Sequence, residues 1–477
     1  MFVGREREMA MLNALYEKPT ASLVLCRGRR RIGKSRLIRE FGSAGGRFLQ
    51  FQGLPPRKGI DQQAQLTAFA ESLAQQTAIP KVKLESWPQA FALLASQVNG
   101  KEKTVILLDE VSWMSMGSPD FAGYLKIAWD TQFSQRSHLV LVVCGSVSTW
   151  LERNILNSTA FVGRLSLILT IDPLAIRYCN EFWGRAAQRV SPREKLEFLA
   201  VAGGVPRYLE EVRPHESAGT TIQRLCFTKE GFLFNEFESI WSDLFSRRGP
   251  IYRRIVTALA DGPQGLAKIS RAAGAMRSGR LAGYLDDLEL SGFVRKEPNL
   301  DLQNTGGAPP KGTRYRIADP YVRFYLKQIV PKQSAIAGNR LSDVPLERIV
   351  NWDAVLGLHF ETLILNNVLE VCRLLEIDPV SVISASPYFQ RATLRRKGCQ
   401  VDLLIQTRHS IWVCEIKCCR KIGMEIIHEM KKKVQALKVQ HHTIRTVLIY
   451  EAELSEDLRS EGYFDRLLPF ERFLRAA

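Results

Sequence analysis

A glycine-rich segment near the amino terminus has the residue types and spacing for binding a phosphate chain. The apolar run Ser22–Cys26 leads into residues 28–35, which fit G-x-x-x-x-G-K-S ahead of a helical pattern. Glycines let the backbone curl so that its amides face a phosphate, and the start of the helix adds its positive dipole end. We expect Lys34 to reach the β- and γ-phosphates of a nucleoside triphosphate and the Ser35 hydroxyl to coordinate Mg²⁺. The predicted nucleotide-binding residues of this segment are Gly28, Arg29, Arg30, Arg31, Ile32, Gly33, Lys34, Ser35 and Arg36.

An acidic pair follows a second apolar run and can complete such a site. Thr104–Leu108 reads as a buried strand, and Asp109 and Glu110 come directly after it. The strand would deliver Asp109 to the carboxyl edge of a sheet, beside the metal. Glu110 could then polarise the attacking water as a general base.

Two later polar residues each have a functional and a plainer interpretation. Ser146 follows the apolar run Leu139–Cys144 and either senses the γ-phosphate or only forms a turn. Arg164 could stabilise transition-state charge as an arginine finger, in its own subunit or on a neighbour, or could be a surface arginine.

An acidic group near the carboxyl terminus predicts a second metal site. Asp402, Glu415 and Lys417 have the spacing D-x12-E-x-K across an apparent hairpin, and alternation puts Glu415 and Lys417 on one strand face. Two carboxylates can hold Mg²⁺, which polarises a scissile phosphate, while a lysine positions or activates water. Glu361, in a helical segment, could supply a third carboxylate. The predicted metal ligands of the whole chain are Ser35, Asp109, Glu361, Asp402 and Glu415.

Basic residues flank this acidic group on both sides. They are Arg391, Arg395, Arg396, Lys397, Arg420, Lys421, Lys431, Lys432 and Lys433. The net charge of +17 and the pI of about 9.5 agree with a polyanionic partner, because lysines and arginines that neutralise phosphates release condensed counterions. We therefore expect DNA as a partner besides ATP. A lysine run on a solvated helix face, in a protein that is merely basic, is the alternative.

The cysteines and the apolar stretches predict a cytoplasmic protein. The nine cysteines are scattered, and no CxxC pair supports a zinc site near Cys414. The amino terminus, MFVGREREM, carries charges where a signal peptide needs an apolar run. The most apolar stretch, 138–144, is far shorter than the ~20 residues needed to span a bilayer. We expect no membrane partner.

Residues 250–325 have the element order of a winged helix. Three helical segments are followed by a strand, a loop rich in glycine and proline, and a second strand. In such a domain the third helix, here about 278–290, commonly lies in the major groove of DNA. The basic residues placed for phosphate contacts are Arg271, Arg277, Arg280, Lys311 and Arg314. The alternative is a domain that packs against the nucleotide domain and transmits its state.

Four motifs together resemble the archaeal-type ATPases, which belong to the STAND and AAA+-related P-loop NTPases. The motifs are Phe2-Val3-Gly4-Arg5-Glu6, residues 28–35, Leu107-Leu108-Asp109-Glu110 and Gly203-Gly204-Val205-Pro206. The resemblance implies that Gly4 and Arg5 lie near the nucleotide base and that Pro206, in a helical lid, contacts or senses the nucleotide. It covers nearly the whole chain, since many members carry a winged helix and a nuclease-like domain in this order.

The acidic group resembles the PD-(D/E)xK nucleases, with Val401 in place of the proline. The predicted fold is therefore α/β: a P-loop NTPase parallel sheet with a helical lid, a winged helix, and a smaller α/β restriction-endonuclease-like domain. The expected boundaries are 1–170 for the ATPase core, 171–246 for the lid, 247–330 for the winged helix, 331–345 for a linker and 346–477 for the nuclease-like domain.

Two functional hypotheses follow from these features. In the first, the protein binds and hydrolyses ATP with Mg²⁺, and its nucleotide state controls a DNA-binding, metal-dependent DNA-cleaving C-terminal domain. In the second, it is a STAND-type switch, in which ATP drives assembly or signalling and the nuclease-like domain is inactive. Both hypotheses are compatible with a homo-oligomer.

Overall fold

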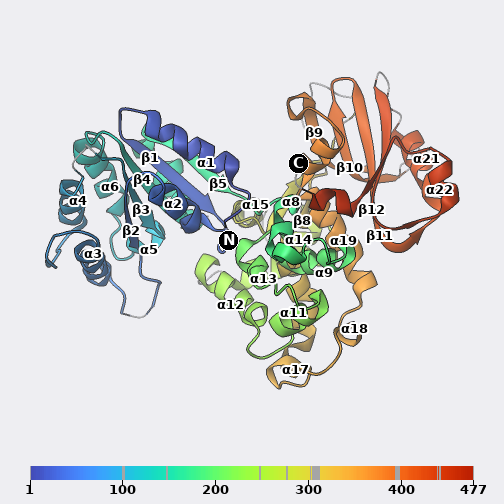
Figure 1. The fold of residues 1–477 in the computed structure, drawn as a ribbon, viewed down its shortest axis with the longest axis horizontal. Helices are drawn as coiled ribbons and strands as arrows, with labels where there is room; N and C mark the ends of the chain where they lie inside the picture. The colour runs from blue at the N-terminus through green and yellow to red at the C-terminus, as the bar shows by residue number, and fades with distance from the viewer. Residues whose placement is uncertain are drawn as a thin grey trace. The chain divides into compact units, whose positions relative to one another are not determined.

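The computed structural model places the chain in two compact units, Met1–Asp172 and Pro173–Ala477 (Figure 1). The structure describes residues 2–57, 59–98, 102–146, 149–245, 249–274, 278–300, 302, 312–390, 392, 398–437, 439 and 442–475. Each unit has its own sheets and cores, and each is described by itself.

The first unit is built on a parallel sheet in the order β2-β3-β4-β1-β5. Its strands are β1 (Ser22–Gly28), β2 (Arg47–Gln52), β3 (Thr104–Asp109), β4 (Leu139–Ser146) and β5 (Leu165–Ile171). The central strands β1, β3 and β4 are buried along nearly their whole length, as expected for a parallel sheet covered on both faces. The predicted parallel sheet is confirmed.

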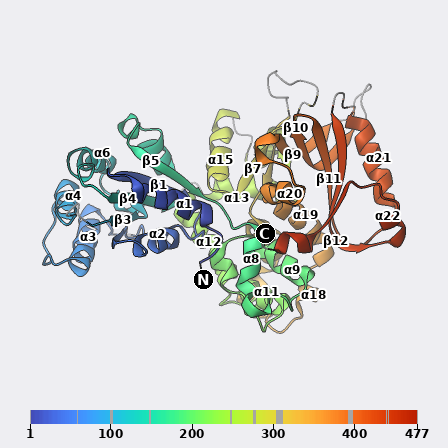
Figure 2. The ribbon, with the colours of Figure 1, turned by 45° about the horizontal axis from the view of Figure 1, so that its top comes forward.

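Helices cover both faces of this sheet (Figures 1 and 2). On one face, α1 (Glu6–Asn13) and α2 (Lys34–Ser43) pack on alternate strand residues such as Val24. On the other, α3 (Gln62–Gln76) and α4 (Trp87–Ser96) pack on the residues between them. The remaining helical segments are η1 (Ala14–Glu17), α5 (Val111–Met114), α6 (Phe121–Ala128), η2 (Trp129–Phe133), α7 (Thr149–Leu151), η3 (Glu152–Leu156) and η4 (Thr159–Phe161).

The second unit begins with helices. They are α8 (Ile176–Cys179), η5 (Asn180–Ala186), α9 (Pro192–Ala202), α10 (Pro206–Leu209), α11 (Ala218–Cys226) and α12 (Phe232–Phe245). The predicted break at 203–206 separates α9 from α10. Gly203 has φ 56°, and a Cβ on Gly204 would lie 2.1 Å from the carbonyl oxygen of Leu174. Leu174 N also donates to Gly204 O at 2.7 Å, so the two glycines let the chain pass close to the segment before α8.

Three helices and a small antiparallel sheet follow. They are α13 (Gly249–Ala258), β6 (Gln264–Gly265), α14 (Leu266–Ala272), α15 (Ser278–Leu290), β7 (Val294–Glu297) and β8 (Arg314–Ile317), with the sheet order β6-β8-β7. The helix and strand order is the one expected, and β6 is an additional strand too short to have a periodic pattern. Most of the predicted loop, as well as Arg277 and Lys311, lies outside the described residues.

Short helices occupy the segment that leads to the last domain. They are α16 (Pro320–Phe324), η7 (Tyr325–Ile329), η8 (Val330–Lys332), α17 (Gln333–Ala337) and α18 (Leu346–Ile349). The expected linker 331–345 therefore contains helix, because Ile336 is fully buried and ties α17 to the unit.

The last part of the chain is a mixed sheet between helices. Its strands are β9 (Val382–Gln390), β10 (Cys399–Thr407), β11 (Ser410–Ile422), β12 (Thr443–Leu454) and β13 (Arg466–Pro469), in the order β13-β12-β11-β10-β9. β9, β10 and β11 are antiparallel, whereas β11, β12 and β13 are parallel. The helical segments are α19 (Trp352–Leu365), α20 (Val368–Leu374), η9 (Pro379–Ser381), α21 (Glu425–Leu437), α22 (Glu456–Ser460) and η10 (Phe470–Leu474). This is the second α/β domain that the sequence predicts.

Among the described helices, none is long and apolar enough by itself to cross a membrane. The pair α19 and α20, bent by 77°, passes that test together by length and composition only.

Candidate nucleotide and acidic sites

The glycine-rich segment forms a curled loop between β1 and α2. Arg31 and Gly33 both have positive φ, 70° and 90°. The Lys34 side chain is only 6% exposed, and its Nζ donates to the carbonyl oxygens of Gly28 and Arg29, both at 3.1 Å. Gly28 itself has no room for a side chain, because a Cβ there would lie 2.6 Å from Ile171 O. The loop thus presents a buried ammonium and a close-packed backbone at the carboxyl end of β1.

Arg5 supports the backbone of this loop through hydrogen bonds. Its Nη2 donates to Ile32 O at 3.3 Å and to Asp172 O at 2.8 Å, and its Nη1 pairs with Glu8 at 3.2 Å. The guanidinium is buried, so these contacts join the amino-terminal segment, the loop and the end of β5. Gly4, at φ 66°, turns the chain just before it. Sequence reasoning placed Gly4 and Arg5 near the base and did not anticipate this support of the loop backbone.

The acidic pair and Ser146 lie at the same edge of the sheet. Because β4 lies between β1 and β3, Ser146 is in register with Gly28 on one side. Its backbone N lies 3.5 Å from Glu110 Oε2 on the other. Asp109 is buried and accepts from Glu110 N at 3.1 Å. The structure therefore brings predicted site residues together at the carboxyl ends of the strands, where ligands of open α/β sheets bind. These residues are Gly28, Asp109, Glu110 and Ser146.

The carboxyl group of Glu110 has a raised pKa. Burial is the main cause, the ammonium of Lys34 opposes it, and the charge of Asp109 adds to it. A carboxylate with higher proton affinity is better suited to take a proton from water. The hydroxyl of Ser35, in the first turn of α2, and the carboxylate of Asp109 are oxygen groups of the kind that could hold Mg²⁺.

The arginines of the loop and of the first turn of α2 have different surroundings. Arg29 is buried, Arg30 is close enough to lower the pKa of Glu110, and Arg36 pairs with Glu40 on the surface at 3.7 Å.

Arg164 does not lie at the carboxyl ends of the strands, where the other predicted residues of the nucleotide site meet. It directly precedes β5, whose first residue, Leu165, pairs with Leu23 near the start of β1, so it lies at the opposite end of the parallel strands. It also forms a two-point ion pair with Asp130, at 2.7 and 2.9 Å, and with Lys126 this lowers the pKa of Asp130 to about 2. A role for Arg164 at the nucleotide site of its own subunit is thus contradicted by its position in the sheet. Pro206 lies in the second unit, where it is the first residue of α10.

The second predicted group converges in the C-terminal domain. Leu403 pairs with Cys414 in the antiparallel ladder, which sets Asp402 opposite Glu415. Asp402 Oδ2 accepts from Ile416 N at 2.9 Å, and Lys417 Nζ lies 3.0 Å from Glu415 Oε1. Glu415 is almost completely buried, with 2% of its side chain exposed. Asp402, Glu415 and Lys417 therefore form one compact group on β10 and β11.

Helix α21 places Lys433 beside this group, whereas the sequence predicted this lysine only as part of a basic run. Lys433 Nζ forms an ion pair with Glu415 Oε2. On the same helix, Glu429 lies 3.5 Å from Lys417 Nζ. Glu429 and Lys433 are four residues apart, and Lys433 lies between the buried residues Met430 and Leu437, which is the signal that could have revealed them.

Glu361 lies close to this group, near enough for the charge of Asp402 to act on its carboxyl. Burial raises its pKa to about 7, with a further increase from the charge of Asp402. Burial and Glu415 raise the pKa of Asp402 to about 6. Within the described ranges, no three His, Cys, Asp or Glu side chains are grouped so that they could hold a metal, and this applies to Asp402 and Glu415 as well as to Glu361. Glu361 also lines a small hollow together with Glu297 of β7.

Replacing Glu361 by glutamine is expected to stabilise the protein above pH 7. The unfolded carboxyl loses its proton near pH 4.5 and the folded one near 7, so the folded protein loses stability as the pH rises between these values. The variant removes that loss, which is about 3 kcal/mol. Melting temperatures at pH 5.5 and pH 8 should differ less in Glu361→Gln than in the parent. The exposed Glu456→Gln is the control, and equal differences in all three proteins would contradict the assignment.

The basic residues of the three-helix segment differ in their partners. Arg271 and Arg280 are exposed, whereas the Arg314 guanidinium lies 3.4 Å from the centre of the Phe389 ring. Next to it, Arg316 Nε pairs with Glu297 at 2.6 Å and its Nη2 donates to Asn366 at 3.0 Å. The strand β8 is thus tied to the C-terminal domain by arginines.

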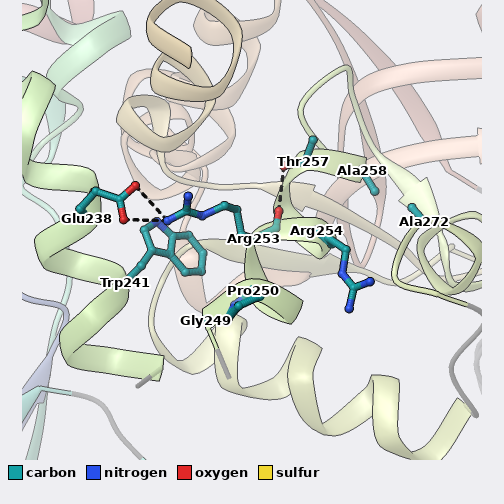
Figure 3. A pocket seen from close by; sticks show the side chains of 9 residues that line it. All are labelled: Glu238, Trp241, Gly249, Pro250, Arg253, Arg254, Thr257, Ala258 and Ala272. Carbon is teal, nitrogen blue, oxygen red and sulfur yellow. Dashed lines mark hydrogen bonds and ion pairs between the residues drawn. The ribbon is translucent and has the colours of Figure 1, made fainter. Parts of the chain in front are cut away.

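An open hollow of about 720 Å³ is lined by residues of α12, α13 and α14 (Figure 3). Trp241 and Arg254 line it, and Arg253 makes a two-point ion pair with Glu238 at its rim, at 2.8 and 3.0 Å. It contains neither group of predicted site residues.

Comparison with known proteins bears on the first of these sites. Residues 2–212 match the family model of an ATPase domain found predominantly in Archaea. This part of the chain is similar to the archaeal-type ATPase domains. The loop around Lys34, the pair Asp109 and Glu110, and the helices as far as residue 212 all lie within it.

Similarity to other proteins extends beyond the ATPase domain. An uncharacterized protein of Methanocaldococcus jannaschii is 26% identical over 367 residues, 76% of each chain. The Walker-type ATPase of Pyrococcus abyssi has a similar fold, with a TM-score of 0.51 and 20% identity over 68% of this chain and 95% of its own. The ORC2 protein of Aeropyrum pernix matches with a TM-score of 0.42 and 14% identity over 72% of this chain and 96% of its own.

Proposed function

We propose that this protein binds and hydrolyses ATP, and that its nucleotide state controls metal-dependent DNA cleavage by the C-terminal domain. The ATPase domain supports the first part. The observation that carries the second is the convergence of Asp402, Glu415 and Lys417 on adjacent strands. Residues 249–317 would act as a winged helix, and the domain of β9 to β13 as a restriction-endonuclease-like fold.

In the nucleotide site, the loop amides and Lys34 bind the phosphates, and Glu110 accepts a proton from the attacking water. Ser35 and Asp109 would hold Mg²⁺, which would supply positive charge beside the phosphates. Arg5 keeps the loop in position through Ile32 O. Ser146, next to Glu110, is suited to respond to the γ-phosphate.

In the C-terminal site, Asp402 and Glu415 provide the two carboxylates with which Mg²⁺ is commonly bound beside a phosphate. Lys417, 37% exposed, is placed between the buried carboxylate and solvent, where it can orient water toward a phosphodiester. The basic residues Lys431 and Lys432 on α21 are exposed and suited to the DNA backbone.

A buried helix offers a route between the lid and this site. Helix α19 packs on both α9 and β11. His359 Nδ1 lies 2.5 Å from Ala200 O of α9, and Arg323 donates to Thr362 at 2.5 Å. A shift of α9 would therefore move the helix that carries Glu361 against Asp402.

Replacing Glu110 by glutamine tests the proposed control. ATP turnover should fall about 100-fold, because the general base is lost while phosphate binding by Lys34 remains. The protein would then stay in its ATP state, so ATP should change its cleavage rate about fivefold or more relative to nucleotide-free protein. Phosphate release and the cutting of plasmid and single-stranded DNA, with Mg²⁺ or Mn²⁺, measure both effects.

The exposed Glu71→Gln, in the same unit, is the matched control and should behave as the parent. Cleavage that is equal with and without ATP in both the parent and Glu110→Gln would reject control by the nucleotide.

A second function is a switch without nuclease activity, assembled or released by ATP. The observation in its favour is that both oxygens of Glu415 are held in ion pairs, as in a purely structural network. Arg314 likewise contacts Phe389 rather than facing solvent freely. Retained ATP hydrolysis with no cutting of any DNA would favour this function. An oligomeric, cytoplasmic protein fits either function, and Arg164 could then act only on a neighbouring subunit.

A further inference from the structure

Helix α21 directs one lysine of its basic run into the acidic group. Lys431 and Lys432 are exposed, whereas Lys433 is only 20% exposed. The helix buries Met430 and Leu437 on the face that packs against β10 and β11. Lys433 is three residues after Met430 and four before Leu437, so it lies on the same face of the helix. The packing of this face against β10 and β11 therefore places its ammonium beside Glu415.

Lys417 and Lys433 each pair with a different oxygen of the Glu415 carboxylate. Lys417 takes Oε1 from the adjacent position on β11, and Lys433 takes Oε2 from α21. A buried carboxylate must be paired, because an isolated charge at this depth would be very costly. Lys417 is the more exposed of the two and is also shared with Glu429. Lys433 is therefore the main buried counter-ion of Glu415.

An ammonium ion and a divalent cation at this carboxylate exclude one another. Both are attracted to the same oxygen, and like charges a few ångströms apart repel strongly where water is largely absent. Both oxygens of Glu415 are paired with ammonium groups, so a metal that binds this carboxylate has to displace one of them. Lys433 holds Oε2, and Asp402 Oδ2 beside it already accepts from Ile416 N.

We propose that Lys433 is an internal counter-ion that competes with a divalent metal for Glu415. The proposal rests on the metal centre of the proposed function. Lys433 occupies Glu415 Oε2 until a cation displaces it, and it thereby sets the metal concentration at which the centre is loaded. It is a positioning residue, since it acts through Glu415.

Titration with Mn²⁺ alone, without nucleotide and at one pH, tests this competition. Lys433→Met should bind Mn²⁺ about five- to tenfold more tightly than the parent, measured by calorimetry and by the signal of free Mn²⁺ in electron paramagnetic resonance. Lys433→Arg keeps the positive charge and should bind no more tightly than the parent. Lys229→Met, at an exposed lysine of the same unit, should leave the affinity unchanged.

Each outcome decides one point. Equal or weaker Mn²⁺ binding by Lys433→Met, in protein whose melting temperature shows that it is folded, would overturn the competition. If Lys433→Met does not fold, a Lys433→Gln protein that also binds no more tightly than Lys433→Arg overturns it. Mn²⁺ binding that is the same in the parent and in Glu415→Gln rejects the metal centre itself, and with it the proposed nuclease.

Discussion

Replacing Lys34 by alanine is expected to weaken ATP binding by about 100- to 1000-fold and to abolish measurable ATP turnover. The side chain is buried in the loop, so its ammonium can contact phosphate with little competition from water. Removing one partner of such a charged contact commonly costs 2–5 kcal/mol or more. The two carbonyl oxygens that Lys34 now bonds, those of Gly28 and Arg29, would in addition lose their donor.

Equilibrium binding of ATP and release of phosphate measure this effect. Lys81→Ala is the matched control, because Lys81 is an exposed lysine of the same unit that pairs only with Glu71 among the described residues. Similar melting temperatures would separate a lost contact from a collapsed loop. A Lys34→Ala protein that binds ATP as tightly as the parent would remove the nucleotide site from this account.

Replacing Glu415 by glutamine is expected to lower DNA cleavage about 1000-fold. The substitution keeps the size of the side chain and removes its charge, so Asp402 is left as the single carboxylate of the proposed pair. The several kcal/mol by which a metal lowers the barrier of phosphate chemistry are then lost. ATP hydrolysis should be unchanged, because Glu415 lies outside residues 2–212, which match the family model of the ATPase domain.

Cutting of plasmid DNA and release of phosphate should be measured on the same preparation. Glutamine leaves Lys417 and Lys433 without their shared carboxylate, so folding must be checked by circular dichroism. Asp402→Asn, which keeps both ion pairs, should show a similar loss, and the exposed Glu456→Gln should show none. Undiminished cutting by Glu415→Gln would exclude this centre as the nuclease.

Both predictions start from short motifs, and these could be read from the sequence for a physical reason. The loop around Lys34 depends on glycines and on a helix start that are contiguous in the chain, and Asp109 follows directly on an apolar run. The parallel sheet could be predicted as well, since its buried strands are continuous apolar segments between helices. In the C-terminal domain, the hairpin spacing was enough to expect Asp402 beside Glu415.

The contacts between distant segments could not be predicted in this way. Arg5 reaches Ile32 and Asp172, Lys433 reaches Glu415, and Arg164 lies at the far end of the sheet, all because of how strands and helices are ordered in space. The sequence of a single segment does not determine which other strands and helices will lie beside it. Periodicity shows that Lys433 shares a face with buried residues, but only the packing of α21 on β10 and β11 shows which carboxylate it meets.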